Sequence, residues 1–269
     1  MAEEKPARPE RQYEPRRAAL KDKFQTERGY WNGFWDLLLR DDPDYFEAYL
    51  NFSSAPWRHG SLAPKVKEFI YIAIDTSATH MFKPGLRIHV QNALKHGATR
   101  AEIMEVLELS SEMGIHSCST GMPILVEEMH ALGLAPETPP PLSAAQVALR
   151  ERFIAVLGDW HAGWEQLLAM APEFFAAYLE MAEVPRRGTQ LDAKTKELVL
   201  IGLSAAVTAL HHNELRSHIR RALQLGATPA EVAEVLQLIS VLGIHAFTLG
   251  MPTMLEEIKA TAAQGPSAA

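Results

Sequence analysis

The sequence predicts an all-α protein made of two tandem copies of one domain, each with about six helices. Aligning the 269-residue chain with itself gives one dominant offset of 129 residues, at which residues 62–128 match residues 191–257 without a gap and 29 of 67 positions are identical. A match at a fixed offset is the signature of a repeated structural unit. No alternation of β-branched residues bounded by turn signals appears, so no strands are expected.

Helical periodicity recurs at the same place in both copies. Ile103, Val106 and Leu107 follow the i, i+3, i+4 spacing of an amphipathic helix. Thr99 precedes this helix with Glu102 three residues later, a capping box that the second copy repeats with a threonine and a glutamate at the same spacing. A glycine two residues before each box suits the C-cap of the preceding helix.

The domain organisation follows from the repeat and from proline content. The segments 69–78 and 198–210 are apolar nearly all round, which predicts a central helix in each copy. A Pro-rich stretch between the copies is typical of a linker. The expected parts are a flexible arm (1–20), a first helical domain (21–133), the linker (134–144), a second helical domain (145–262) and a flexible tail (263–269).

Composition excludes several classes of protein. A net charge of −7 argues against a nucleic-acid partner, because binding phosphates requires a basic face. We find no apolar run of about 18 residues for a membrane span and no signal-peptide pattern, and therefore expect a cytoplasmic protein without a membrane partner. Cys118 is the sole cysteine, which excludes an intrachain disulfide, and its apolar neighbours predict an unreactive core residue.

One group of polar residues in the second copy could carry chemistry. Glu214 and His218 are four residues apart on a predicted helix, and His211 lies one turn earlier on the same stripe. A carboxylate held against an imidazole suits a general acid or base, although a solvent-facing pair would have the same spacing. His211 and His218 lie about 10 Å apart along the axis. That is too far for one ion, so no metal is expected.

The first copy differs at this point. His89 and Arg87 are kept, but Gly85 replaces the glutamate, while His80 and His116 remain nearby. This copy either is a scaffold that has lost its own site or forms a different pocket.

The second copy resembles a known superfamily. The run E-L-R-x-H, then A-L-x-x-G-A-T-x-x-E-x-x-E-V-L and G-x-P, within residues 197–257, is similar to the carboxymuconolactone decarboxylase and alkylhydroperoxidase D superfamily. The peroxidase branch has a C-x-x-C pair where this chain has His211 and Glu214, so peroxidase activity is not expected. The decarboxylase tyrosine is replaced by Ser119 in one copy and Thr248 in the other.

The resemblance implies roles for particular residues. His218 would be the proton donor, oriented by Glu214, and Arg216 would bind a substrate carboxylate. Other candidates for the catalytic or binding site are His211, His245, Glu197, His89, His116 and Arg87. Glu197 resembles the relay glutamate of the peroxidase branch, but an acidic first helical turn would look the same. The repeated His116 and His245 could equally be hydrogen-bonded core residues.

The resemblance also implies a function. We expect a cofactor-independent acid/base enzyme that acts on a small unsaturated carboxylate or lactone, a decarboxylase in aromatic-compound catabolism. The alternatives are an isomerase or hydratase working through the same dienolate, or a non-catalytic oligomeric binding protein with a decayed site. Single-domain relatives form rings, which favours a homo-oligomer, specifically a trimer. The aromatic stripe of Trp31, Phe34, Trp35 and Leu38 could form part of the contact or simply be core.

Overall fold

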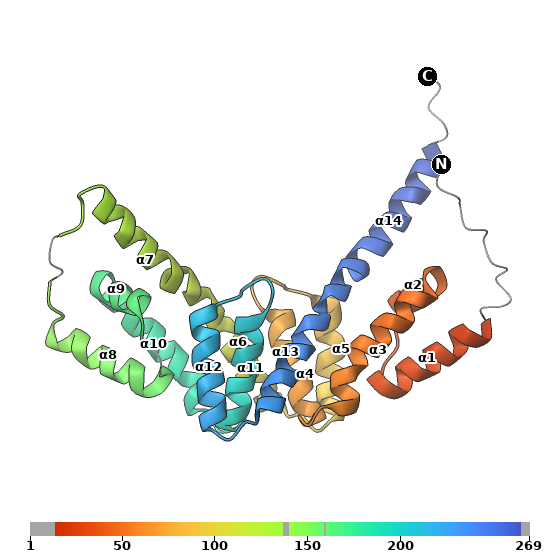
Figure 1. The fold of residues 1–269 in the computed structure, drawn as a ribbon, viewed down its shortest axis with the longest axis horizontal. Coiled ribbons are helices and arrows are strands. Elements are labelled where there is room, and N and C mark those ends of the chain that lie inside the picture. Colours follow the sequence, from red (N-terminus) through yellow and green to blue (C-terminus); the bar gives the residue numbers. More distant parts are fainter. Residues whose placement is uncertain (1–13, 137–139, 159, 265–269) are drawn as a thin grey trace. The chain divides into compact units, whose positions relative to one another are not determined.

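The computed structural model describes residues 14–136, 140–158 and 160–264, and this part of the chain is helical throughout its regular structure (Figure 1). The all-α prediction is confirmed. The first copy contains α1 (Glu14–Arg28), α2 (Gly33–Asp41), α3 (Pro43–His59), α4 (Pro64–Thr76), α5 (Lys83–Lys95), α6 (Arg100–Ser111) and α7 (His116–Ala131). The second contains α8 (Ala144–Leu157), α9 (Ala162–Met170), α10 (Pro172–Arg187), α11 (Ala193–Ala205), α12 (His212–Gln224), α13 (Pro229–Ser240) and α14 (His245–Gln264).

Each copy has one helix more than the expected six. A 3-10 turn, η2 (Glu112–Ile115), lies between α6 and α7, and η3 (Val241–Ile244) lies between α13 and α14. Residues 14–20, expected to belong to the arm, form the beginning of α1. The rest of the arm (1–13), residues 137–139 of the linker and residues 265–269 of the tail lie outside the described residues.

The chain packs into two units that cut across the two sequence copies. One unit comprises residues 1–60 and 240–269, and the other comprises residues 61–239. In the first unit α14 of the second copy packs against α2, and in the other α7 of the first copy packs against α9. The C-terminal helix of each copy therefore packs on N-terminal helices of the other copy, which boundaries drawn along the chain do not anticipate.

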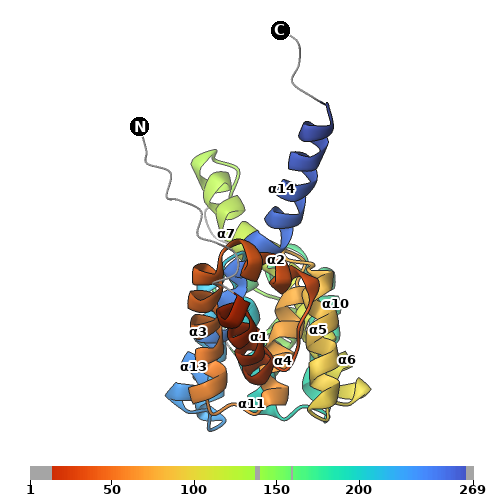
Figure 2. The same ribbon diagram turned by 90° about the vertical axis from the view of Figure 1, so that its right-hand side faces the viewer.

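The unit of residues 61–239 is organised around α4 and α11, which pack against each other. Helices α5 and α6 lie beside α4 (Figure 2), and α12 packs against α11. Every residue of 67–75 and 195–204 is buried, as the all-round apolar pattern predicts. Both helices end a few residues earlier than expected. The turns that follow contain Met81 and Leu210, equivalent residues that both have φ of 48°.

Two equivalent ion pairs are buried in this unit. Lys67 on α4 lies 2.7 Å from Glu234 on α13, and Lys196 on α11 lies 3.4 Å from Glu105 on α6. Each carboxylate also accepts two backbone N–H groups from the segment before the partner lysine's helix. Burying a charge is costly unless it is paired and hydrogen-bonded, and both conditions are met here. The pairs connect helices of different copies.

Helix termini follow the sequence signals. Thr99 accepts from the Glu102 amide while the Glu102 carboxylate accepts from the Thr99 amide, and the same reciprocal bonds join Thr228 and Glu231. Both capping boxes are confirmed. Gly97 and Gly226 have φ of 81° and 86°, the left-handed geometry that ends α5 and α12.

The unit of residues 1–60 and 240–269 has an aromatic core. Phe24, Trp35 and Phe46 form it together with Ile244 and Met251 of the second copy. The stripe considered as an oligomer contact lies against this cluster: Trp35 and Leu38 are buried, and Trp31 and Phe34 pack on it. The stripe is core.

One helical segment passes a length and hydropathy test for a membrane span. Residues 229–261 contain an 18-residue window with mean hydropathy of 1.7. The window is not an uninterrupted apolar run, because glutamine, serine, histidine and threonine are scattered through it. The core helix of a soluble protein passes the same test.

Candidate functional site

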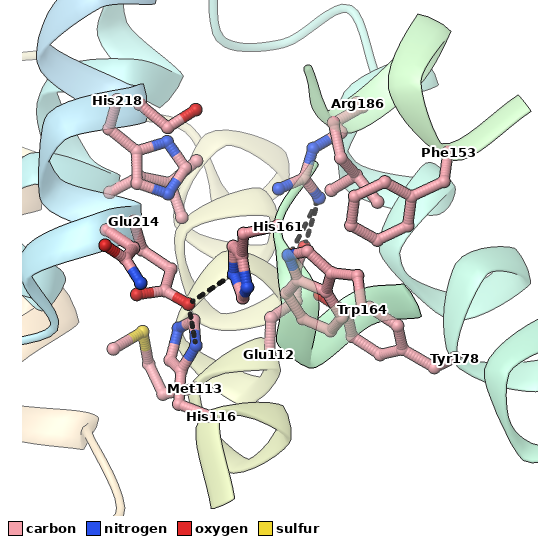
Figure 3. A pocket seen from close by; sticks show the side chains of 14 residues that line it. Glu112, Met113, His116, Phe153, His161, Trp164, Tyr178, Arg186, Glu214 and His218 are labelled. Carbon is pink, nitrogen blue, oxygen red and sulfur yellow. Dashed lines mark hydrogen bonds and ion pairs between the residues drawn. The ribbon is translucent and has the colours of Figure 1, made fainter. Parts of the chain in front are cut away.

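A cavity of about 50 Å³ lies within the unit of residues 61–239, and both copies contribute to it (Figure 3). The first copy supplies η2 and the start of α7. The second supplies α8, α9, α10, α11 and α12. The polar or charged side chains lining it are Glu112, His116, His161, Tyr178, Arg186, Asn213, Glu214, Ser217 and His218.

Glu214 is the centre of one polar group in this cavity. Its Oε1 accepts a hydrogen bond from the Ser119 hydroxyl at 3.2 Å and lies 3.3 Å from His116 Nδ1 and 3.5 Å from His161 Nε2 (Figure 3). His161 Nδ1 accepts the Gly163 N–H, so a neutral His161 carries its proton on Nε2, toward Glu214. Burial raises the pKa of Glu214, but the two histidines outweigh it and hold that pKa well below its usual range.

Glu197 and His218 form a second polar pair in the same region. Glu197 Oε2 lies 2.8 Å from His218 Nδ1, and Glu197 Oε1 accepts from Arg221 Nε at 2.9 Å. Burial raises the pKa of Glu197, but the hydrogen bond with His218 and the charge of Arg221 lower it further than burial raises it. The expectation that Glu214 orients His218 is corrected: the partner of His218 is Glu197, reached from the neighbouring helix α11.

The arginine that lines the cavity is Arg186 on α10. Its Nη1 donates to both carboxylate oxygens of Glu112 at 2.7 Å. Burial raises the pKa of Glu112 although Arg186 opposes the shift. Arg216 and Arg87, the arginines expected to bind substrate, are both exposed and are not among the residues that line the cavity. Arg216 and His218 are two residues apart on α12, so their side chains lie on different faces of the helix.

Aromatic side chains form part of the cavity wall. Phe153, Trp164 and Tyr178 line it, and the rings of Trp164 and Tyr178 stack with centroids 5.8 Å apart. Burial raises the pKa of Tyr178, so its hydroxyl stays protonated. An apolar wall of this kind lowers the local dielectric and strengthens the charge interactions within the cavity.

The remaining predicted residues lie in different places. His211 precedes α12, its ring lies 4.2 Å from that of His116, and it lines an adjacent cavity of about 450 Å³ that shares Met113 and His116 with the first. Burial lowers the pKa of His211. His245 begins α14 in the other unit and is not part of this cavity. His89 is buried on α5.

Among the described residues, one of the groups of side chains that could hold a metal ion lies at this cavity. The ligand atoms of His116, His211 and Glu214 all lie within 4.8 Å of one another. The spacing of histidines along α12 gave no reason to expect a metal, but the third member of this group, His116, comes from the other copy. The same atoms already serve as hydrogen-bond and ion-pair partners, as Glu214 shows.

Sequence reasoning missed Glu112, His161 and Arg186. All three lie outside the segment that matches the superfamily motif. The repeat did contain a signal for two of them, because the copies differ at these positions. At the 129-residue offset, His161 is equivalent to Asn32 and Arg186 to Trp57.

Comparison with known proteins agrees with the fold and with the motif. Residues 43–115 and 172–263 match the Carboxymuconolactone decarboxylase family. A crystal structure from Burkholderia xenovorans LB400, described as a "putative gamma-carboxymuconolactone decarboxylase subunit", is 39% identical, with a TM-score of 0.86 over 91% of this chain and 98% of that one. A search of curated proteins gives no match. The chain belongs to the carboxymuconolactone decarboxylase family.

Proposed function

We propose that this protein is a cofactor-independent acid/base enzyme acting on a small unsaturated carboxylate or lactone, with decarboxylation in aromatic-compound catabolism as the reaction. One observation carries the proposal: histidines from two separate histidine–carboxylate groups line the same cavity as Arg186. A general acid or base needs an oriented imidazole, and a carboxylate substrate needs a cation.

The proposed roles differ from those implied by the motif alone. Arg186 binds the substrate carboxylate while Nη1 stays paired with Glu112. Loss of carbon dioxide breaks the carbon–carbon bond and leaves its electron pair in a dienolate. His116, which faces Glu214 through Nδ1, donates from Nε2 to the dienolate oxygen, and His218, which faces Glu197 through Nδ1, delivers the proton from Nε2 to carbon. His161 holds Glu214 in place. Preorganised donors of this kind are a large source of rate acceleration.

The size of the cavity bears on how a substrate enters. A volume of about 50 Å³ holds only a few waters. The adjacent cavity of about 450 Å³ shares Met113 and His116 with it, so a shift of these two side chains would join the two spaces. We propose this as the route for substrate.

The alternatives use the same groups differently. An isomerase or hydratase would form the same dienolate and use His218 in the same way. A binding protein with a decayed site would keep the cavity without turnover. The oriented His218 pair favours an enzyme.

The test is a screen of unsaturated lactones and dienoic acids for loss of ultraviolet absorbance and release of carbon dioxide. Arg186→Lys keeps a charge beside Glu112 but loses the guanidinium, so we expect a raised KM. Arg216→Lys is the matched control, since Arg216 is exposed, and should leave KM unchanged. Carbon dioxide release identifies the decarboxylase, and absorbance change without it identifies the isomerase or hydratase. Absence of turnover across the screen would favour the binding protein.

Assembly and location complete the proposal. We propose a cytoplasmic homotrimer, in which three two-domain chains supply six domains. Light scattering that reports a 29.9 kDa monomer at micromolar concentration would contradict this assembly.

A further inference from the structure

Three side chains with metal-binding atoms lie where the two cavities of the candidate site meet. Glu214 and His116 line the cavity of about 50 Å³, and His116 and His211 line the adjacent cavity of about 450 Å³. One ligand atom from each of the three lies within 4.8 Å of the other two. An ion held by this group would lie at the boundary between the cavities, within reach of a ligand in the larger one.

The spacing of His116 and Glu214 matches two neighbouring ligands of a four-coordinate ion. His116 Nδ1 lies 3.3 Å from Glu214 Oε1. Nitrogen and oxygen ligands lie about 2.0–2.2 Å from a zinc ion, so two of them at neighbouring corners of a tetrahedron are about 3.3–3.6 Å apart. An ion can therefore replace the proton between the imidazole and the carboxylate without a change in their spacing.

His211 completes the group from a fixed backbone with an adjustable ring. Its backbone N–H donates to the Ser204 carbonyl at 3.0 Å, which holds the main chain just before α12. Within the described part of the chain its ring has no hydrogen-bond partner, and it lies against the ring of His116 with centroids 4.2 Å apart. Two protonated imidazoles would repel each other at this separation, so at least one ring is neutral and offers a lone pair. A small rotation of His211 is enough to bring a ring nitrogen to the ion.

The surroundings of Glu214 hold its carboxylate in one orientation. The Ser119 hydroxyl donates to Oε1 at 3.2 Å, and His161 Nε2 lies 3.5 Å from the same oxygen (Figure 3). In metal sites, hydrogen-bond partners of this kind orient the ligating groups and contribute to the affinity for the ion. Glu214 is therefore positioned as a ligand before an ion binds.

The first copy does not repeat this set of ligands. At the 129-residue offset Phe82 replaces His211, Gly85 replaces Glu214, and Asp75 on α4 replaces Ser204 on α11. A Cβ atom at position 85 would collide with Oδ2 of Asp75 and with the ring of Phe82. These two side chains thus fill the space in which an equivalent of Glu214 would begin, and the arrangement on α12 is particular to the second copy.

We propose that His116, His211 and Glu214 bind a divalent transition-metal ion such as Zn²⁺, with a fourth coordination position open to the cavity of about 450 Å³. Two imidazoles and one carboxylate suit Zn²⁺ and its first-row neighbours, whereas Mg²⁺ and Ca²⁺ prefer oxygen ligands alone. Three protein ligands with one open position are typical of a zinc site that binds water or a ligand oxygen.

The metal site goes beyond the proposed function and does not require it. An ion on Nδ1 of His116 leaves a proton on Nε2, so the donor role proposed for that nitrogen is compatible with a bound ion. Metal binding is measured without a substrate. Its failure is therefore distinguishable from a failure of the proposed function.

The test is a titration of the metal-free full-length protein with Co²⁺, which substitutes for Zn²⁺ and absorbs visible light. We expect wild type to develop the intense bands of four-coordinate Co²⁺, and Zn²⁺ but not Mg²⁺ to abolish them. His211→Ala should bind one Co²⁺ fewer per chain than wild type, because it removes one ligand. His212→Ala, which replaces the neighbouring exposed histidine, is the matched control and should bind like wild type.

Two further variants sharpen the test. Ser119→Ala keeps all three ligands but loses a donor to Glu214, so we expect Co²⁺ to bind about 10–100-fold more weakly. Glu214→Gln, which is similar in size, should lose the same Co²⁺ as His211→Ala and replaces it if thermal melts show that His211→Ala does not fold. Equal Co²⁺ binding by wild type and by the folded ligand variant would overturn the proposal, and so would the absence of a four-coordinate spectrum in wild type.

Discussion

The two copies share a scaffold and differ in where they hold one carboxylate. Glu214 in the second copy is surrounded by donors from Ser119, His116 and His161, and its pKa falls well below the usual range. Asp75 in the first copy is buried without a hydrogen bond, and its pKa rises to about 8. The fold thus holds one carboxyl group as an ion-paired anion and the other as a buried group with a raised pKa.

The largest expected effect separates the histidines of the two copies. His218→Ala should abolish turnover of a carboxylate substrate, because it removes the proposed proton donor while alanine preserves α12. His89→Ala should cost less, because its site lacks the arginine that accompanies Glu197. Steady-state kinetics on the substrate from the screen would measure both. Equal losses would show that the copies do not differ in this way.

Replacing the fixed anion should have the next largest effect. Glu214→Gln removes the negative charge that orients His116 and His161, so we expect kcat to fall on the order of 10²–10⁴-fold. Ser119→Ala removes only one donor to the same oxygen and should cost less. A smaller loss in Glu214→Gln than in Ser119→Ala would show that the hydroxyl, rather than the carboxylate, organises the histidines.

The sequence predicted the repeated scaffold well. The capping box at Thr99 and the buried helices α4 and α11 follow from local signals, which the chain carries twice. The exchange of α7 and α14 between the copies was not predictable, because a helix of either copy presents the same apolar face to either set of partners. Residues 14–20 were misassigned because their alternating charges resemble a solvated arm.

The candidate site was predicted in part. His218 and Glu214 do line one cavity, yet the spacing rule that paired them on α12 could not show that Glu197, on another helix, is closer to His218. The 21-residue separation of Glu197 and His218 has no meaning until α11 and α12 pack together. Arg186 and His161 come from α10 and from the start of α9, which carry no superfamily motif.

A stability measurement tests whether the copies are alike outside the site. Lys67→Met and Lys196→Met each leave a buried glutamate without its cation, and we expect each to lower the free energy of unfolding by about 3–5 kcal/mol. Urea unfolding of the two variants gives the comparison. A large difference between them would mean that the equivalent ion pairs do not support the two copies equally.

The most direct test of the central claim is the pH dependence of unfolding for Asp75→Asn and Glu214→Gln, each compared with wild type. The folded-state pKa of Asp75 is raised, so its contribution to stability is present below about pH 4 and is lost as pH rises toward 8. Asp75→Asn should therefore become progressively more stable than wild type from pH 5 to 8. The pKa of Glu214 is lowered, so its contribution is present above about pH 4.5 and is lost on acidification.

Glu214→Gln should accordingly be less stable than wild type at pH 7, with a deficit that shrinks as the pH falls below about 4.5. Urea unfolding across this pH range measures both differences without a substrate. The account predicts opposite signs for the two variants at neutral pH. If Asp75→Asn instead lost stability relative to wild type between pH 5 and 8, Asp75 would be a second fixed anion and the proposed division between the copies would be wrong.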